Sequence, residues 1–126
     1  MSLHLGALTL LVRDYDEALA YYVGVLGFEM LEDTDLGGGK RWIRVAPPGA
    51  TTALLLAEAA TSEQAQHIGH QAGGRVFLFL HTTDFSADYA RLLARGVQFL
   101  EQPRHESYGS VAVFEDCYGN KWDLLG

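Results

Sequence analysis

VRDYDEALAYYVGVLGFEML, residues 12–31, contains apolar side chains at the three- and four-residue spacing of an amphipathic helix. These side chains are Ala18, Leu19, Tyr22 and Leu26. Asp14 is available as the N-cap of this helix, and Gly27 follows it as a C-cap. The run LGALTLLV at 5–12 comes before the helix and has the apolar character of a strand. This part of the chain therefore predicts a strand followed by a helix.

Three short strands are predicted after the helix, because clusters of Gly and Pro separate apolar runs that are too short for buried helices. They lie at 28–34, 40–46 and 51–57. The second half of the chain repeats the same order of elements. It contains a strand at 75–82, a helix from about Asp84 to Gly96, and strands at 97–102, 109–115 and 120–125. The sequence thus predicts a βαβββ module that is used twice.

Matching cap and turn residues support a duplication. The pairs are Asp14 and Asp84, Gly27 and Gly96, and Gly49 and Gly119. The separation is 69 or 70 residues in each pair, as expected for an internal repeat. We predict a single domain over 1–126, with module one at about 3–57 and module two at about 75–126. The polar, Gly-rich segment at about 58–74 is the expected linker, with room for one helical turn.

Each helix can cover only one face of its sheet. Alternation along the first strand places Leu8, Leu10 and Val12 under the helix. It leaves Ala7, Thr9 and Leu11 on the other face. Two such sheets, side by side or across a dimer interface, would form a half-open barrel around a cup-shaped pocket. The expected fold class is α+β.

The composition limits the classes of partner. The chain has 126 residues, 48% of them hydrophobic, and a formal charge of −7, which disfavours binding to nucleic acid or to an anionic membrane. No apolar stretch is long enough to span a bilayer and no leader segment is evident, so we expect a cytoplasmic protein. The single cysteine, Cys117, cannot form an internal disulfide and lacks the paired spacing of a zinc site.

Four stretches together resemble the vicinal oxygen chelate superfamily, which includes glyoxalase I, extradiol dioxygenases and bleomycin-resistance proteins. They are VRDYDEALAYYVGVLGFEML, RWIRVAPPG, RLLARGVQFLEQP and FEDCYGNKWDLL. The similarity extends over nearly the whole chain. It implies glyoxalase-like βαβββ modules, a cup-shaped cavity and usually a homodimer.

In metal-dependent members, the resemblance implies four His or Glu side chains around a divalent ion, from the first and last strands of each module. The corresponding positions here are Ala7, Ala53, Arg75 and Asp123, with Val76 replacing Arg75 if the register slips by one residue. Alanine has no donor atom and arginine does not give up its proton. We therefore expect no family-type metal site and no cofactor. A divalent metal remains possible, with Asp123 as a weak ligand.

An Arg75–Asp123 ion pair could stand in place of the metal, because a buried carboxylate is tolerated beside a guanidinium. The alternative is that Arg75 opens its strand in solvent while Asp123 is half exposed at a sheet edge.

Trp42 and Arg44 share one strand face and could bind an aromatic acid, whereas Arg41 and Ile43 share the other face. The full set of predicted ligand-binding residues is Arg75, Asp123, Trp42, Arg44, Phe77, Phe79, His81 and Tyr108.

The leading hypothesis is a protein that binds a small aromatic or anionic organic molecule without a family-type metal. Its catalytic residues, if any, are not identified. The alternative is a divalent-metal lyase, isomerase or extradiol dioxygenase with displaced ligands. Those ligands would be residues such as His81, His105, Glu115 and Asp123. A third possibility is a structural domain whose cup is filled, which would be favoured if Phe77 and Phe79 met at the pocket centre.

Overall fold

The computed structural model describes residues 2–126 and contains two compact units, with the boundary between Ile68 and Gly69. Each unit has one mixed sheet and helical segments, so the predicted α+β class is confirmed. Neither described sheet closes into a barrel. Within residues 2–126, no helix is both long enough and apolar enough to cross a membrane.

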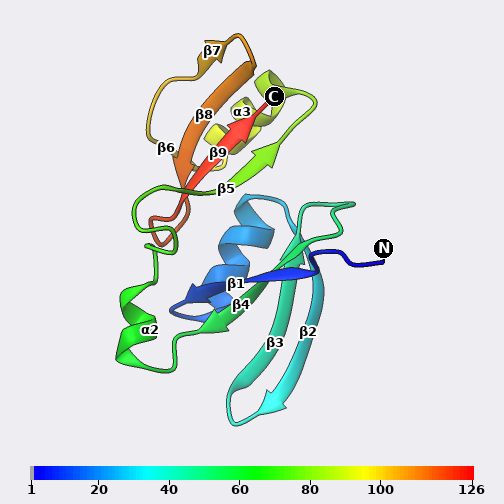
Figure 1. Cartoon of the computed structure of the whole chain (residues 1–126), viewed down its shortest axis with the longest axis vertical. Helices are drawn as coiled ribbons and strands as arrows, with labels where there is room; N and C mark the ends of the chain where they lie inside the picture. The colour runs from blue at the N-terminus through cyan, green and yellow to red at the C-terminus, as the bar shows by residue number, and fades with distance from the viewer. Residues whose placement is uncertain (1) are drawn as a thin grey trace. The chain divides into compact units, whose positions relative to one another are not determined.

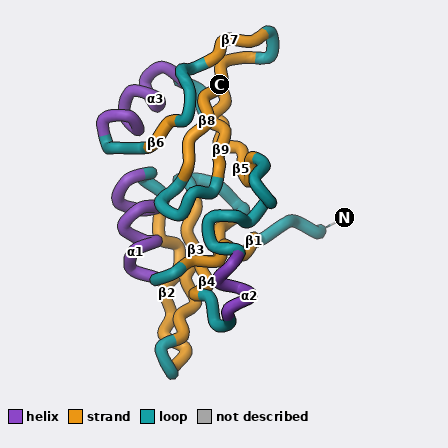
Figure 2. The backbone as a smooth tube through the Cα atoms, turned by 90° about the vertical axis from the view of Figure 1, so that its left-hand side faces the viewer, coloured by secondary structure: helices purple, strands orange, loops and turns teal. Residues whose placement is uncertain are grey.

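The first unit contains a four-stranded sheet in the order β1-β4-β3-β2, in which only β1 and β4 are parallel (Figure 1). Its strands are β1 (Ala7–Val12), β2 (Glu29–Gly37), β3 (Lys40–Ala46) and β4 (Ala53–Glu58). Its helices are α1 (Tyr15–Leu19), η1 (Ala20–Val25) and α2 (Ser62–Gln66). The α1–η1 segment lies along one face of this sheet (Figure 2).

The predicted N-cap is confirmed, since Asp14 Oδ2 accepts a hydrogen bond from the Glu17 backbone N–H at 2.8 Å. Gly27 follows the helix with a φ of 81°, a conformation that favours glycine. The second half of the helix is a π-helix, η1, which the apolar spacing did not predict. There the Leu26 N–H reaches back to the Tyr21 carbonyl at 2.9 Å, which widens the turn by one residue.

Burial in β1 follows the predicted alternation. Leu10 and Val12 are fully buried beneath the helix, and Leu8 is half-buried. Thr9 on the opposite face is exposed, and Leu11 is half-buried. The core of the unit therefore lies between the sheet and α1–η1, and the other face of the sheet carries a different set of side chains.

The second unit contains a sheet in the order β5-β9-β8-β6, with β7 added to β8. Its elements are β5 (Val76–His81), α3 (Phe85–Ala94), β6 (Gln98–Phe99), β7 (Arg104–Glu106), β8 (Gly109–Glu115) and β9 (Lys121–Leu125). Two expectations were wrong here. The strand expected at 97–102 is only two residues long, and the segment between the strands expected at 97–102 and 109–115, where none was predicted, contains β7. Pro103 lacks an N–H and separates the two segments that pair with β8.

A chain of aromatic rings forms the core of the second unit on the α3 side of the sheet. Neighbouring ring centroids lie 4.5 to 6.1 Å apart, within the range of favourable aromatic pairs. The rings belong to Phe85, Tyr89, Phe99, Phe114 and Trp122. Phe114 and Trp122 are thus core residues rather than lining of a pocket.

The last part of the expected linker is held against the turn before β9. The Gln71 N–H donates to Asn120 Oδ1 at 3.2 Å, and Lys121 Nζ donates to the Gly74 carbonyl at 3.2 Å. A Cβ built on Gly69 would lie 1.9 Å from the Tyr118 carbonyl oxygen. Only glycine fits at position 69, because a backbone atom cannot move aside as a flexible side chain can.

Two alanine substitutions test this contact. Gly69 and Gly73 both have positive φ, 76° and 64°, but nothing lies within 4 Å of a Cβ at Gly73. We expect Gly73→Ala to lower the free energy of unfolding by about 1 kcal/mol through backbone strain alone. Gly69→Ala should lower it by more than about 2 kcal/mol, because it adds a steric clash. Urea unfolding measures both values, and equal losses would contradict the close approach of Tyr118.

Candidate functional site

The helix-free face of the first sheet carries a row of side chains that crosses all four strands. The register pairs Glu32 with Arg44, Arg44 with Leu55, and Leu55 with Thr9. Because residues paired across strands share a face, these four side chains lie on the face away from α1–η1. Trp42 lies two residues before Arg44 and shares this face, as the sequence predicted. The row brings together a carboxylate, a guanidinium, an aliphatic side chain and a hydroxyl group, with the indole of Trp42 on the same surface.

A hollow of ≈ 520 Å³ lies beside this row. Residues of the helix-free face form much of its lining, and Gln64 of α2 contributes a polar group. The lining residues on this face are Thr9, Leu11, Lys40, Trp42, Leu55 and Ala57, and Arg41 from the other face also borders the hollow. Trp42 is 41% exposed, a large fraction for an aromatic side chain on a sheet. The volume lies within the range of pockets that bind small organic molecules.

Glu32 joins the two most distinctive side chains on this face. Its Oε1 atom accepts a hydrogen bond from Trp42 Nε1 at 3.1 Å and another from Arg44 Nε at 3.0 Å. The side chains of Arg44 and Glu32 remain 34% and 38% exposed. One carboxylate therefore orients both an indole and a guanidinium where a ligand could reach them.

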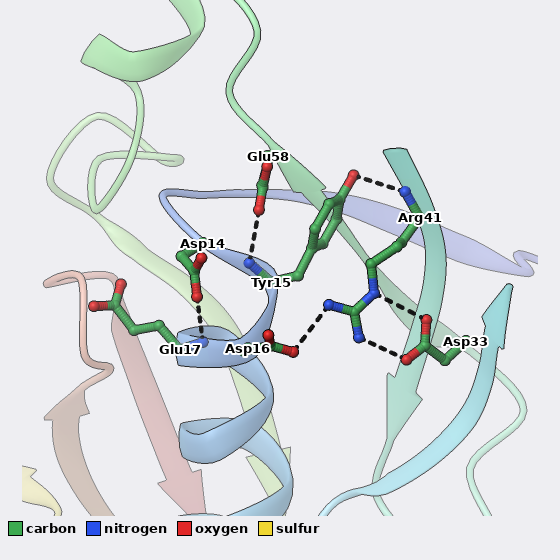
Figure 3. Close-up of polar contacts among 7 residues, drawn as sticks. All are labelled: Asp14, Tyr15, Asp16, Glu17, Asp33, Arg41 and Glu58. Carbon is green, nitrogen blue, oxygen red and sulfur yellow. Dashed lines mark hydrogen bonds and ion pairs between the residues drawn. The ribbon is translucent and has the colours of Figure 1, made fainter. Parts of the chain in front are cut away.

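Arg41 has a structural role on the opposite face. Its Nε and Nη2 atoms contact the two oxygens of Asp33 at 3.2 and 2.7 Å, and Nη1 contacts Asp16 at 2.9 Å (Figure 3). The guanidinium carbon lies 5.3 Å from the ring centroid of Tyr15, whose N–H donates to Glu58. The hydrogen bonds to Arg41 lower the pKa of Asp33, and those from Asp33 and Asp16 raise the pKa of Arg41. Arg41 thus ties the β2–β3 hairpin to the start of α1.

Asp123 lies on the helix-free face of the second sheet, between Phe79 of β5 and Val113 of β8 in the strand register. Its Oδ1 atom is buried and has no hydrogen-bond partner among the described residues. Loss of water around the carboxylate raises its pKa, an effect that the positive charge of Arg104 partly opposes. The partner that the sequence suggested for this carboxylate was Arg75, but Oδ1 has no hydrogen-bond partner within residues 2–126.

The cation that acts on Asp123 is Arg104 rather than Arg75. Arg104 pairs with Val111 in the strand register and so shares the face of Asp123. Its Nε and Nη1 atoms contact Glu101 at 2.9 Å and Glu106 at 3.2 Å. Arg75 lies just before β5 and is exposed. In residues 2–126 no hydrogen bond or ion pair joins Arg75 to Asp123.

The remaining predicted ligand-binding residues are spread over the second unit. Phe79 is 57% exposed beside Asp123, and His81 follows on the same face. Phe77 is half-buried at an irregularity in the pairing of β5 with β9. Tyr108 is 69% exposed in the turn between β7 and β8. His105 Nδ1 lies 2.7 Å from Ser110 Oγ, on the face opposite Arg104.

The residues at the family's metal positions do not fit a metal ion. Ala7 pairs directly with Ala53, and neither side chain has a donor atom. The strand register also changes the residue that corresponds to Asp123 in the first module. Asp123 pairs with Phe79, and the counterpart of Phe79 in the first module is Thr9. Thr9 pairs with Leu55, so Leu55 rather than Ala53 corresponds to Asp123. Leucine is equally unable to bind a metal. In residues 2–126, no three or more His, Cys, Asp or Glu side chains are grouped so that they could hold a metal ion.

The environment of Asp123 leads to a pH-dependent prediction. Its raised pKa means that the folded chain holds a proton there more tightly than the unfolded chain does. Stability should therefore fall as the pH rises from about 4 through the raised pKa. Asp123→Asn, which does not ionise, should melt on the order of 2 °C higher than the native protein at pH 7, and this gap should close below about pH 4.

Glu29→Gln is the matched control, because it removes the same charge from an exposed carboxylate. A gap of equal size in both variants would assign the effect to net charge rather than to desolvation of Asp123.

Comparisons with known proteins agree with this architecture. The model of the Glyoxalase/Bleomycin resistance protein/Dioxygenase superfamily matches residues 4–124. An uncharacterized protein of Shewanella frigidimarina is 53% identical over 120 residues, which cover 94% of this chain and 89% of that protein. The crystal structure of UcmS2 is 31% identical, with a TM-score of 0.85 over 99% of this chain and 98% of that one. TnmS3, an antibiotic binding protein from Streptomyces sp. CB03234, is 34% identical, with a TM-score of 0.79 over 99% and 97%. The chain belongs to the Glyoxalase/Bleomycin resistance protein/Dioxygenase superfamily.

Proposed function

We propose that this protein binds a small aromatic or anionic organic molecule, without a family-type metal site. The observation that carries the proposal is the partly exposed indole of Trp42 on the lining of the ≈ 520 Å³ hollow. Arg44 is joined to this indole through their shared contact with Glu32. A mainly apolar wall with a few oriented polar groups is the usual character of a ligand site. An aromatic ligand would lie against the indole and the apolar side chains of Leu11 and Leu55.

Similarity to an antibiotic binding protein supports this proposal. TnmS3 shares 34% of its residues with this chain over nearly their full lengths. The four family metal positions here offer only the carboxylate of Asp123, a poor donor set for a metal-dependent reaction. Binding rather than metal-assisted chemistry therefore accounts better for the residues present. A homodimer, the usual assembly implied by the family, is part of the proposal.

The second unit offers another patch of the same character. Phe79 is exposed beside Asp123, whose buried Oδ1 has no hydrogen-bond partner among residues 2–126. We assign this patch to ligands with an N–H or O–H donor, because a buried unpaired acceptor gains most from such a partner. Arg75, Phe77, His81 and Tyr108 remain proposed contacts around this patch.

The test is a thermal-shift screen of planar aromatic compounds in buffer containing EDTA. At least one compound should raise the melting temperature saturably, and it should change tryptophan fluorescence, since the chain has two tryptophans and Trp42 is the exposed one. Trp42→Ala should weaken that binding by about tenfold, the loss of roughly 1.4 kcal/mol of aromatic contact. Trp122→Phe keeps Trp42 and should retain both the binding and the fluorescence change.

A screen with no saturable hit, or binding that requires an added divalent ion, would count against the proposal. Unchanged affinity in Trp42→Ala would show that the ligand does not bind at the Trp42 face of the first unit.

A further inference from the structure

Arg44 differs from the other well-contacted arginines because most of its guanidinium is unused. Its Nε atom donates to Glu32, but within residues 2–126 neither terminal nitrogen has a hydrogen-bond partner. Arg41 uses all three nitrogens on Asp33 and Asp16, and Arg104 uses two on Glu101 and Glu106. A guanidinium has five N–H donors, so Arg44 keeps four for another partner.

Glu32 holds the two terminal nitrogens of Arg44, called here the free edge of the guanidinium, in a fixed direction. It accepts from Arg44 Nε and Trp42 Nε1 with the same oxygen, while its other oxygen accepts from Thr34 Oγ1 at 3.4 Å. Arginine and tryptophan side chains lose rotamer freedom on binding, and a contact that already restrains them lowers that entropic loss. The indole and the guanidinium are therefore preorganised side by side.

The free edge selects one chemical class of ligand. Two parallel N–H groups match the planar pair of oxygens in a carboxylate, and they also suit a sulfonate. The negative charge of Glu32 does not prevent this, because Arg41 already holds two carboxylates, Asp33 and Asp16, on one guanidinium. The indole of Trp42, which shares Glu32 with Arg44 and lines the hollow, then favours a ligand whose acidic group is attached to an aromatic ring.

We propose that Glu32 positions Arg44 to bind the acidic group of an aromatic carboxylate or sulfonate whose ring lies against Trp42. The assignment rests on the proposed function and narrows it to aromatic acids. Arg44 is the contact residue for the acid, and Glu32 is a positioning residue that acts through Arg44 and Trp42.

Two fluorescent probes separate the ring from the acid. 8-Anilinonaphthalene-1-sulfonate and N-phenyl-1-naphthylamine share the same aromatic rings, and only the first has a sulfonate. Titration of each into the native protein should give about tenfold or greater preference for the sulfonate, as expected for charge-assisted hydrogen bonds. Arg44→Gln should abolish that preference and leave the affinity for the neutral probe within about twofold, the range of a surface substitution.

Arg13→Gln is the matched control, because Arg13 is an exposed arginine whose ion pair with Glu17 lies outside the row. It removes the same charge and should leave the preference unchanged. Glu32→Ala distinguishes positioning from simple electrostatics. Removing a nearby negative charge would by itself strengthen anion binding, whereas losing the positioning contact should weaken sulfonate binding several-fold. Glu32→Gln retains an acceptor and should bind better than Glu32→Ala.

The outcomes separate the two proposals. Binding of both probes with equal affinity would overturn the assignment to aromatic acids but leave the proposed function intact. Failure of both probes to bind would overturn the assignment to aromatic acids, and the proposed function would then depend on the screen of planar aromatic compounds. Tighter sulfonate binding by Glu32→Ala would overturn the positioning role of Glu32. An equal loss of preference in Arg13→Gln and Arg44→Gln would assign the preference to net charge and overturn the contact.

Discussion

The structure depends on the fact that a βαβββ module has one helix for a sheet with two faces. In each unit the helix side is filled by side chains that need no further partner, such as Leu10 and Val12 in the first and Leu124 in the second. Strand alternation then places every second residue on the helix-free face. Trp42 and Asp123 lie on such faces, where they do not contribute to the helix-covered core. Side chains on these faces are therefore not needed for packing the helix-covered core, and they can serve in binding.

The two arginines of β3 differ in how many N–H donors their contacts leave unused. Arg41 is satisfied by two carboxylates and stacks near Tyr15, so its contacts hold a hairpin to a helix. Among residues 2–126, Arg44 makes one hydrogen bond, through Nε to Glu32, and its other nitrogens lie on the face away from the helix. The difference arises because side chains alternate between the two faces of a strand, so residues an odd number of positions apart point to opposite faces. Arg41, which holds the hairpin, and Arg44, which we propose as a ligand contact, can therefore lie three residues apart in one strand.

The sequence predicted the order of elements well because helix caps, turn glycines and short apolar runs mark where each element begins and ends. Asp14 caps a helix, and glycines 37 to 39 turn the hairpin with positive φ. It did not predict the π-helical turn at Ala20–Val25 or strand β7, because both depend on backbone pairing that apolar spacing does not encode. The site was only partly predictable for the same reason. Trp42 and Arg44 were found by alternation, but Glu32 required the cross-strand register.

A simple count could have identified Glu32, since it and Arg44 are equally distant from Gly38 at the hairpin centre. No such count was available for Arg104 and Asp123, whose strands are joined only through β8. The net charge of −7 adds a final constraint on the site. A field of that sign repels an anionic ligand at a distance. If the protein binds an aromatic acid as we propose, the affinity must come from short-range contact with the Arg44 guanidinium. The orientation imposed by Glu32 then matters more than charge alone.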